Sequence, residues 1–153
     1  MAIDSLPTTH ASAVLIGAHA VLIRGPSGAG KSRLAFDLIM LAGRGGLPFA
    51  RLVGDDRVIL EARSGRLLVR PAPLLAGLIE IRGLGIRRLA YEPVAVVGLV
   101  IDLAASDAER LPPVEAGQTA ISGIELPRLA VAPATDAATL ILAWRASTAA
   151  TGE

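Results

Sequence analysis

The sequence contains no cysteine and no asparagine, and only one of its 153 residues is a lysine. Without cysteine there is no disulfide framework, no thiolate metal site and no cysteine nucleophile. Aromatic residues make up only 3%, so the core must be built from Ala, Val, Leu and Ile. Neither charge is in excess, since 15 basic residues face 14 acidic ones, and this balance argues against binding nucleic acid through bulk charge.

Targeting and membrane signals are also lacking. The first residues have neither the basic nor the apolar region of a signal peptide. The most apolar stretch, 93–105, is interrupted by Asp102 and is shorter than the roughly 20 residues that span a bilayer. We therefore expect a soluble cytoplasmic protein that binds no membrane. The length predicts one domain over residues 1–153, with an ordered core from about 8 to 145 and short tails.

The apolar patterns predict an α/β fold in which a mixed sheet is combined with few helices. Two apolar runs, 13–16 and 20–23, are separated by three residues, which predicts a tight β-hairpin with His19 solvated at its tip. Leucines at helical spacing predict a helix from Leu34 to Leu41, with Gly43 as its stop. The remaining expected elements are strands at 52–53, 58–61, 66–69, 78–81, 94–103 and 124–131, a turn at 64–65, a break at 71–73, a loop at 111–117 and a closing helix at 135–144.

The segment Gly25-Pro26-Ser27-Gly28-Ala29-Gly30-Lys31-Ser32 fits the phosphate-binding pattern G-x-x-x-x-G-K-[ST] at every fixed position. Glycines let successive backbone N–H groups turn inward around a phosphate, and a helix beginning near Lys31 points its positive end at it. The Lys31 ammonium can reach the β- and γ-phosphates, and the Ser32 hydroxyl can bind Mg²⁺. The alternative is a glycine-rich turn, but the expected strand before the loop and helix after it favour nucleotide binding.

Acidic residues that could work with this loop occur at three positions. Asp55 and Asp56 follow a short apolar run, and adjacent side chains on an extended chain point to opposite sides. One carboxylate could therefore face Mg²⁺ while the other acts as a general base, unless the pair is a solvent-facing turn. Glu80 interrupts a hydrophobic strand and is either an exposed-face position or a site group.

His10 is placed by the register of the first hairpin. If the hairpin has a two-residue loop, paired positions put His10 opposite Gly25, and a three-residue loop puts it opposite Pro26. Either register predicts that the imidazole lies beside the mouth of the phosphate loop. The alternative is a disordered N-terminal histidine.

These residues resemble the HPr kinase/phosphorylase family, whose members phosphorylate a serine of the phosphocarrier HPr. The resemblance rests on four pieces in order: His10, the loop from Gly25 to Ser32, the pair Asp55-Asp56, and Ile79-Glu80-Ile81-Arg82-Gly83-Leu84-Gly85-Ile86. The last piece is close to the family's own signature. Together they cover nearly the whole chain and match the family's catalytic domain alone, similar to the short form of alphaproteobacteria.

The resemblance implies a P-loop-containing kinase domain that uses ATP and Mg²⁺. It implies that Lys31 is catalytic, that Ser32 and Glu80 bind the metal, and that Asp56 takes the proton of the serine. Further catalytic positions implied by the resemblance are His10, Asp55, Arg82 and Arg110. The implied partner is HPr or its nitrogen-branch relative, with no nucleic acid or membrane, and the implied assembly is a homohexamer.

The chain departs from the family pattern at two places. Arg33 stands where the family usually has glutamate after Lys-Ser, and residues 132–137 lack the glycine and arginine linked to dephosphorylation. The sequence therefore predicts the kinase reaction without predicting the reverse phosphorylase reaction. Alternatives are a nucleotide-binding sensor without turnover and a small-molecule P-loop kinase. A GTPase is disfavoured, because a chain without asparagine cannot form the Asn-Lys-x-Asp motif that recognises guanine.

Overall fold

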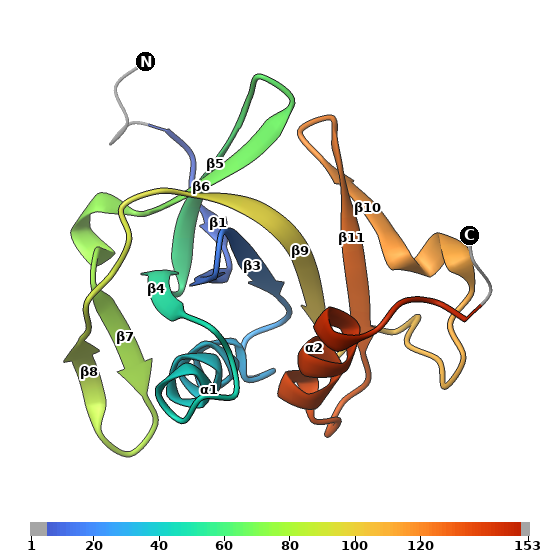
Figure 1. Cartoon of the computed structure of the whole chain (residues 1–153). Coiled ribbons are helices and arrows are strands. Elements are labelled where there is room, and N and C mark those ends of the chain that lie inside the picture. The colour runs from blue at the N-terminus through green and yellow to red at the C-terminus, as the bar shows by residue number, and fades with distance from the viewer. Residues whose placement is uncertain (1–5, 151–153) are drawn as a thin grey trace.

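The computed structural model describes residues 6–150, which form a large mixed sheet, a small two-stranded arm and two helices (Figure 1). The nine-stranded sheet has the order β1-β5-β6-β9-β3-β2-β4, with β11 beside β9 and β10 beside β11. The strands of this sheet are β1 (Thr9–His10), β2 (Ser12–Ile16), β3 (His19–Arg24), β4 (Ala50–Gly54), β5 (Arg57–Arg63), β6 (Arg66–Pro71), β9 (Ala95–Leu103), β10 (Gln118–Ile121) and β11 (Ile124–Val131). The expected mixed sheet with few helices is confirmed.

A parallel trio of strands, β3, β9 and β11, lies at the centre of the part of the sheet that meets the helices. β9 is parallel to β3 and to β11, so the carboxyl ends of the three strands meet at one edge. Helix α1 (Lys31–Gly43) follows β3 through a short loop, and α2 (Ala137–Ala146) follows β11. The two helices pack side by side beneath the sheet in Figure 1. Ligands of open α/β sheets bind at this edge.

Both faces of the sheet are buried. One cluster, which includes Val14, Ile23 and Ile101, packs under α1 and α2. The opposite face holds a second cluster, which includes Leu22 and Leu67. Every fully enclosed member of the two clusters is Ala, Val, Leu or Ile, as the scarcity of aromatic residues predicted.

The predicted first hairpin forms, and of the two loop lengths considered it has the two-residue one, because Ile16 pairs with His19. The helix ends at Gly43 as predicted, but Gly43 is not the left-handed residue that follows the helix. That left-handed residue is Gly45, with φ of 82°. The closing helix begins two residues later than predicted, because the side chain of Asp136 caps its N-terminus by accepting from the Thr139 N–H.

Several short elements were not predicted. Strands β1, β8 (Gly85–Arg88) and β10 are two to four residues long and have little or no apolar alternation. The predicted loop at 111–117 ends in a 3₁₀ helix, Val114–Gly117, and another 3₁₀ helix forms at Pro73–Leu75. β7 (Leu78–Ile81) has the predicted bounds, and it pairs with β8 to form the separate arm.

Candidate active site

The phosphate loop connects the end of β3 to the start of α1. Three of its glycines have positive φ, with 84° at Gly28 and 99° at Gly30, the residue before the helix. Gly25 is required by close packing, because a Cβ there would lie 3.1 Å from Leu103 Cβ and Leu103 O. The loop therefore has the positive φ angles that allow successive backbone N–H groups to point inward around a phosphate.

Lys31 is buried, with 7% of its surface exposed. Its ammonium donates to the carbonyl oxygens of Gly25 and Pro26 at 2.7 and 3.1 Å, so the side chain folds back over its own loop. These two carbonyls hold the positive charge at the loop, where a phosphate would meet it.

Asp55 is the centre of the polar site. Its side chain accepts from Ser12 Oγ at 2.6 Å and from Ser32 Oγ at 2.8 and 2.9 Å, and its Oδ2 also accepts from the Glu80 backbone N–H at 3.2 Å. Asp55 is 3% exposed, so the solvent-facing alternative does not hold for it. One carboxylate thus joins β2, α1 and the β7–β8 arm.

Ser12 was not singled out in the sequence. It is fully buried beside the core residues Ala11 and Ala13. A polar residue that opens an otherwise apolar strand is the signal that could have found it, because buried hydroxyls need a partner.

Asp56 points away from this centre. The side chain of Asp56 is 63% exposed, and His10 Nε2 lies 3.1 Å from its Oδ1. The expected extended chain at the pair is wrong, since Asp56 has φ of 67° in a bend between β4 and β5. The bend, rather than strand alternation, sends the two carboxylates in different directions.

The predicted register of His10 is also wrong. The β2–β3 ladder ends at the Ser12–Ile23 pair, and His10 instead pairs with Arg57 of β5. The chain leaves the hairpin at Ala11, whose N–H donates to Asp56 O at 3.2 Å. His10 is therefore held against Asp56 and is not opposite Gly25.

The β7–β8 arm brings the signature segment to the site. Glu80 lies on the exposed side of β7 and meets Asp55 through its backbone N–H. Arg82 is exposed at the turn of the arm. Arg110 is exposed in the segment that follows β9, and no contact described for residues 6–150 joins it or Arg82 to Asp55 or Asp56.

A network of ion pairs lies at the ends of the three parallel strands, and none of its members was predicted. Asp102 on β9 accepts from Arg24 on β3 and from Arg128 on β11. Burial raises the pKa of Asp102, but the hydrogen bonds from the two arginines outweigh it and hold the pKa below its usual value. The hydrogen bond from Arg128 likewise lowers the pKa of Asp107.

An open hollow of about 320 Å³ adjoins the phosphate loop. No charged side chain lines it, and it is walled by small and apolar residues: Pro26, Ser27, Gly28, Ala29, Leu103, Ala104, Val131, Ala132, Pro133, Ala134 and Thr135. Residues 132–135 of the segment that departs from the family pattern thus line the same hollow as residues 26–29 of the phosphate loop.

The donor set near the loop suits Mg²⁺ better than a softer metal. Within residues 6–150 no three His, Asp or Glu side chains gather into a cluster able to hold a metal alone. Ser32 and Asp55 offer one hydroxyl and one carboxylate, with the Glu80 backbone bonded to Asp55, and Mg²⁺ commonly binds one or two carboxylates together with substrate phosphates. In the same range, neither helix has the length and apolar character to cross a membrane.

Comparison with known proteins shows the family to which the chain belongs. The family model of the HPr Serine kinase C-terminal domain matches residues 4–148. An HPr kinase/phosphorylase of Geobacillus thermodenitrificans is 38% identical over 138 residues, which cover 82% of this chain and 42% of that protein. One from Mycoplasma mycoides subsp. mycoides is 46% identical over 77 residues, covering 50% of this chain and 22% of that protein. The chain thus spans less than half the length of these relatives.

A solved structure supports the fold over nearly the whole chain. The Hpr(Ser) kinase/phosphatase of Coxiella burnetii is 28% identical and superposes with a TM-score of 0.72. The match covers 92% of this chain and 94% of that one.

Proposed function

Because the chain belongs to the family of the HPr Serine kinase C-terminal domain, we propose that it transfers a phosphoryl group from ATP to a serine of an HPr-type carrier protein. The observation that carries the proposal is the placement of two adjacent carboxylates. Asp55 is buried against the phosphate-loop serine, and Asp56 is exposed beside His10. That arrangement separates a metal-side acid from a substrate-side base.

The phosphate loop binds the donor in this proposal. Backbone N–H groups between Gly25 and Gly30 and the N-terminus of α1 surround the β-phosphate. The Lys31 ammonium moves from the Gly25 and Pro26 carbonyls to the β- and γ-phosphates, since phosphate oxygens are the stronger partners. The uncharged hollow beside the loop accommodates the nucleoside.

Ser32, Asp55 and Glu80 are the residues that would hold Mg²⁺ in the proposed site. Bound there, the ion would neutralise charge on the β- and γ-phosphates. Ser32 Oγ could exchange its bond to Asp55 for one to the metal, because Ser12 and the Glu80 N–H would still hold Asp55 in place. The metal site therefore keeps its shape when Ser32 changes partner.

Asp56 acts as the general base on the serine of the carrier. The serine oxygen attacks the γ-phosphorus, the bond to the β,γ-bridging oxygen breaks, ADP leaves, and the serine proton passes to the Asp56 carboxylate. His10, 3.1 Å from Asp56, orients that carboxylate. Arg82 and Arg110 are exposed cations that can approach the transferring group when the carrier is bound.

The finer parts of the proposal concern the partner and the assembly. The carrier is HPr or its nitrogen-branch relative, the protein works in the cytoplasm, and it assembles as a hexamer. Residues 132–137 contribute no arginine to the lining of the hollow beside the phosphate loop, so phosphorolysis of the phosphoserine is not part of the proposed function.

The test is incubation of the purified protein with ATP, Mg²⁺ and the HPr-type carriers of its own organism. Intact mass should show a gain of one phosphoryl group on one serine, absent with Lys31→Ala. Lys31→Arg should also fail although it keeps the charge, because a planar guanidinium is too bulky for the space that the lysine occupies. ATP binding without phosphorylation of any carrier would favour a sensor instead.

A further inference from the structure

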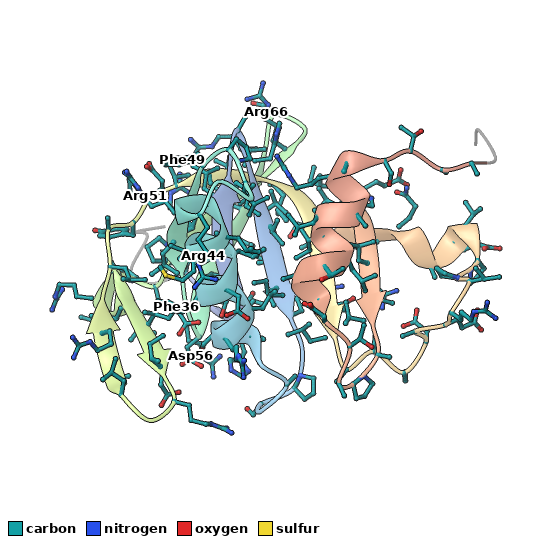
Figure 2. All side chains as sticks on the ribbon, turned by 60° about the horizontal axis from the view of Figure 1, so that its bottom comes forward. Phe36, Arg44, Phe49, Arg51, Asp56 and Arg66 are labelled. Atoms are coloured by element: carbon teal, nitrogen blue, oxygen red, sulfur yellow. The ribbon has the colours of Figure 1, made fainter. Side chains whose placement is uncertain are left out.

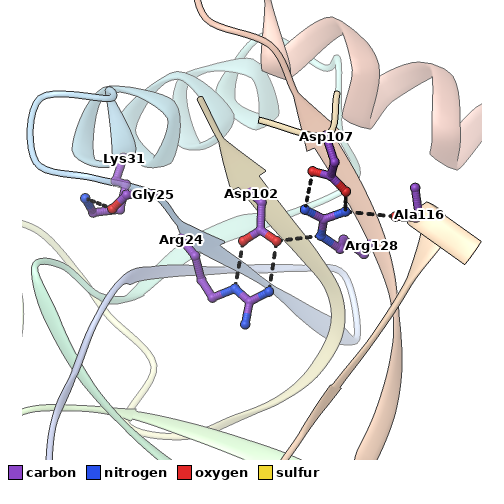
Figure 3. Close-up of polar contacts among 7 residues, drawn as sticks. All are labelled: Arg24, Gly25, Lys31, Asp102, Asp107, Ala116 and Arg128. Carbon is purple, nitrogen blue, oxygen red and sulfur yellow. Dashed lines mark hydrogen bonds and ion pairs between the residues drawn. The ribbon is translucent and has the colours of Figure 1, made fainter. Parts of the chain in front are cut away.

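Four charged side chains form a continuous line of hydrogen bonds across β3, β9 and β11 (Figure 3). Arg24 is the residue directly before Gly25, and its Nε and Nη2 donate to both oxygens of Asp102 at 2.7 and 2.9 Å. Arg128 Nε donates to the same carboxylate from the other side. The base of the phosphate loop is thus tied to β11 through one carboxylate.

The rest of the Arg128 guanidinium faces the segment between β9 and β10. Nη1 and Nη2 donate to the two oxygens of Asp107 at 2.8 and 3.0 Å, and Nη1 also donates to Ala116 O at 3.0 Å. Asp107 lies near the start of this segment and Ala116 near its end. The Arg128 side chain is only 13% exposed, whereas the Asp107 side chain is 51% exposed, so the Arg128 contacts are partly buried at Asp102 and Ala116 and open to solvent at Asp107.

Arg110 lies between these two anchoring points. It is exposed, as is its neighbour Leu111, which is 81% exposed. Residues 108–113 form neither helix nor strand, and the 3₁₀ helix Val114–Gly117 begins only at the end of the loop, so the part around Arg110 has little internal structure to hold its shape. The position of Arg110 therefore depends on where the ends of its loop are fixed.

We propose that Arg128 is a positioning residue, which clamps both ends of loop 108–115 and fixes Arg110 relative to the phosphate loop. The inference rests on the proposed function in so far as Arg110 acts in phosphoryl transfer. Arg128 touches no phosphate-loop residue and acts through Asp102 and Arg24 on one side and through Asp107 and Ala116 on the other. A guanidinium can do this because its planar fork presents five donors in fixed directions, whereas an ammonium cannot span the same partners.

The first experiment measures the loop directly by limited trypsin digestion at the Arg110–Leu111 bond. Releasing charge-assisted hydrogen bonds favours local opening, so Arg128→Gln should speed this cleavage about tenfold. Cleavage at Arg63–Ser64, in the turn of the β5–β6 hairpin, should not change. Arg66→Gln is the matched control, because Arg66 is an exposed arginine at the far end of that hairpin from Asp56 (Figure 2). Equal cleavage at Arg110 in Arg128→Gln and wild type would overturn the clamp.

Asp107→Asn keeps the inference testable if Arg128→Gln does not fold. It leaves the Asp102 and Ala116 contacts of Arg128 intact but removes the charge on the loop side. Faster cleavage at Arg110–Leu111 is expected in this variant too. Arg128→Lys should lie between wild type and Arg128→Gln, because one ammonium restores only part of the contacts.

The second experiment measures transfer and binding separately. Arg128→Gln and Asp107→Asn should lower kcat about tenfold, as a misplaced transition-state cation does, while the Kd for ATP stays within a factor of two. Faster proteolysis with unchanged kcat would overturn the positioning role. If wild type phosphorylates no carrier, the proposed function fails, whereas the proteolysis still decides the clamp.

Discussion

His10 Nε2 lies 3.1 Å from Asp56 Oδ1, although the two residues are 46 positions apart in the sequence. The contact arises because His10 leaves the β2–β3 hairpin and joins β5 beside Arg57, directly after the Asp56 bend. It places an imidazole against the exposed carboxylate of the pair and leaves Asp55 to the phosphate loop.

Asp56→Asn tests whether Asp56 acts as the base while Asp55 serves the phosphate loop. The amide cannot accept the serine proton, so phosphoryl transfer should fall by about 10²–10⁴-fold, the usual contribution of a general base. ATP affinity should stay near wild type, because the hydrogen bonds described for Asp56 go to His10 and Ala11 and not to the phosphate loop. Transfer rates and calorimetric binding check the two parts.

His10→Ala should lower the rate of phosphoryl transfer more than it lowers ATP affinity, and an equal drop in both would contradict the placement of His10 beside Asp56.

Ser12→Ala should destabilise the protein and loosen the position of the Asp55 carboxylate. The substitution removes a donor 2.6 Å from Asp55 Oδ1 in a fully buried place, which should cost about 1–3 kcal/mol of unfolding free energy. The affinity for ATP with Mg²⁺ should fall more than the affinity for ATP alone. Chemical denaturation and titrations with and without the metal check both effects. In an Asp55→Asn background the same substitution should cost less, since the carboxylate partner is gone.

Gly54→Ala should destabilise the fold just ahead of Asp55. A Cβ at Gly54 would lie 2.8 Å from Val58 Cγ1 and 3.1 Å from Pro71 Cα, and such overpacking costs about 1–3 kcal/mol. Gly43→Ala is the matched control, because no atom outside its chain neighbours and the adjacent backbone of α1 lies within 4 Å of its Cβ position. It should be neutral or should stabilise by about 0.5 kcal/mol through helix propensity. Equal destabilisation by both variants would contradict the packing argument.

The Asp102 network predicts how stability depends on pH. Asp102 faces Arg24 from β3 and Arg128 from β11, and Arg128 also faces Asp107, so both carboxyl groups have a pKa below the ordinary 3.8. A lowered folded-state pKa stabilises the fold above 3.8, and that stability is lost as the pH falls below this value. The melting temperature of the wild-type protein should therefore fall as the pH drops below 3.8. Asp102→Asn should show a shallower slope there; an identical slope would exclude the network as its source.

The site was predictable where its residues are adjacent in sequence. The loop from Gly25 to Ser32 and the helix after it depend on local backbone preferences, so a motif is enough to find them. Asp55 and Asp56 were identified as a pair, but their directions were argued from strand alternation, whereas a left-handed residue sets them. Arg128 and Ser12 could not be identified as site residues by a motif, because their partners lie on other strands.

The sequence by itself determined the phosphate loop, the aliphatic core, the presence of the first hairpin, and the bounds of β7 and β11. Each depends on neighbours within a few residues or on a periodic pattern. Only the tertiary structure decided that His10 meets Asp56, that Ser12 supports Asp55, and that Arg128 joins Asp102 to Asp107. These contacts arise from strand order and register, which bring distant residues together and leave no local pattern in the chain.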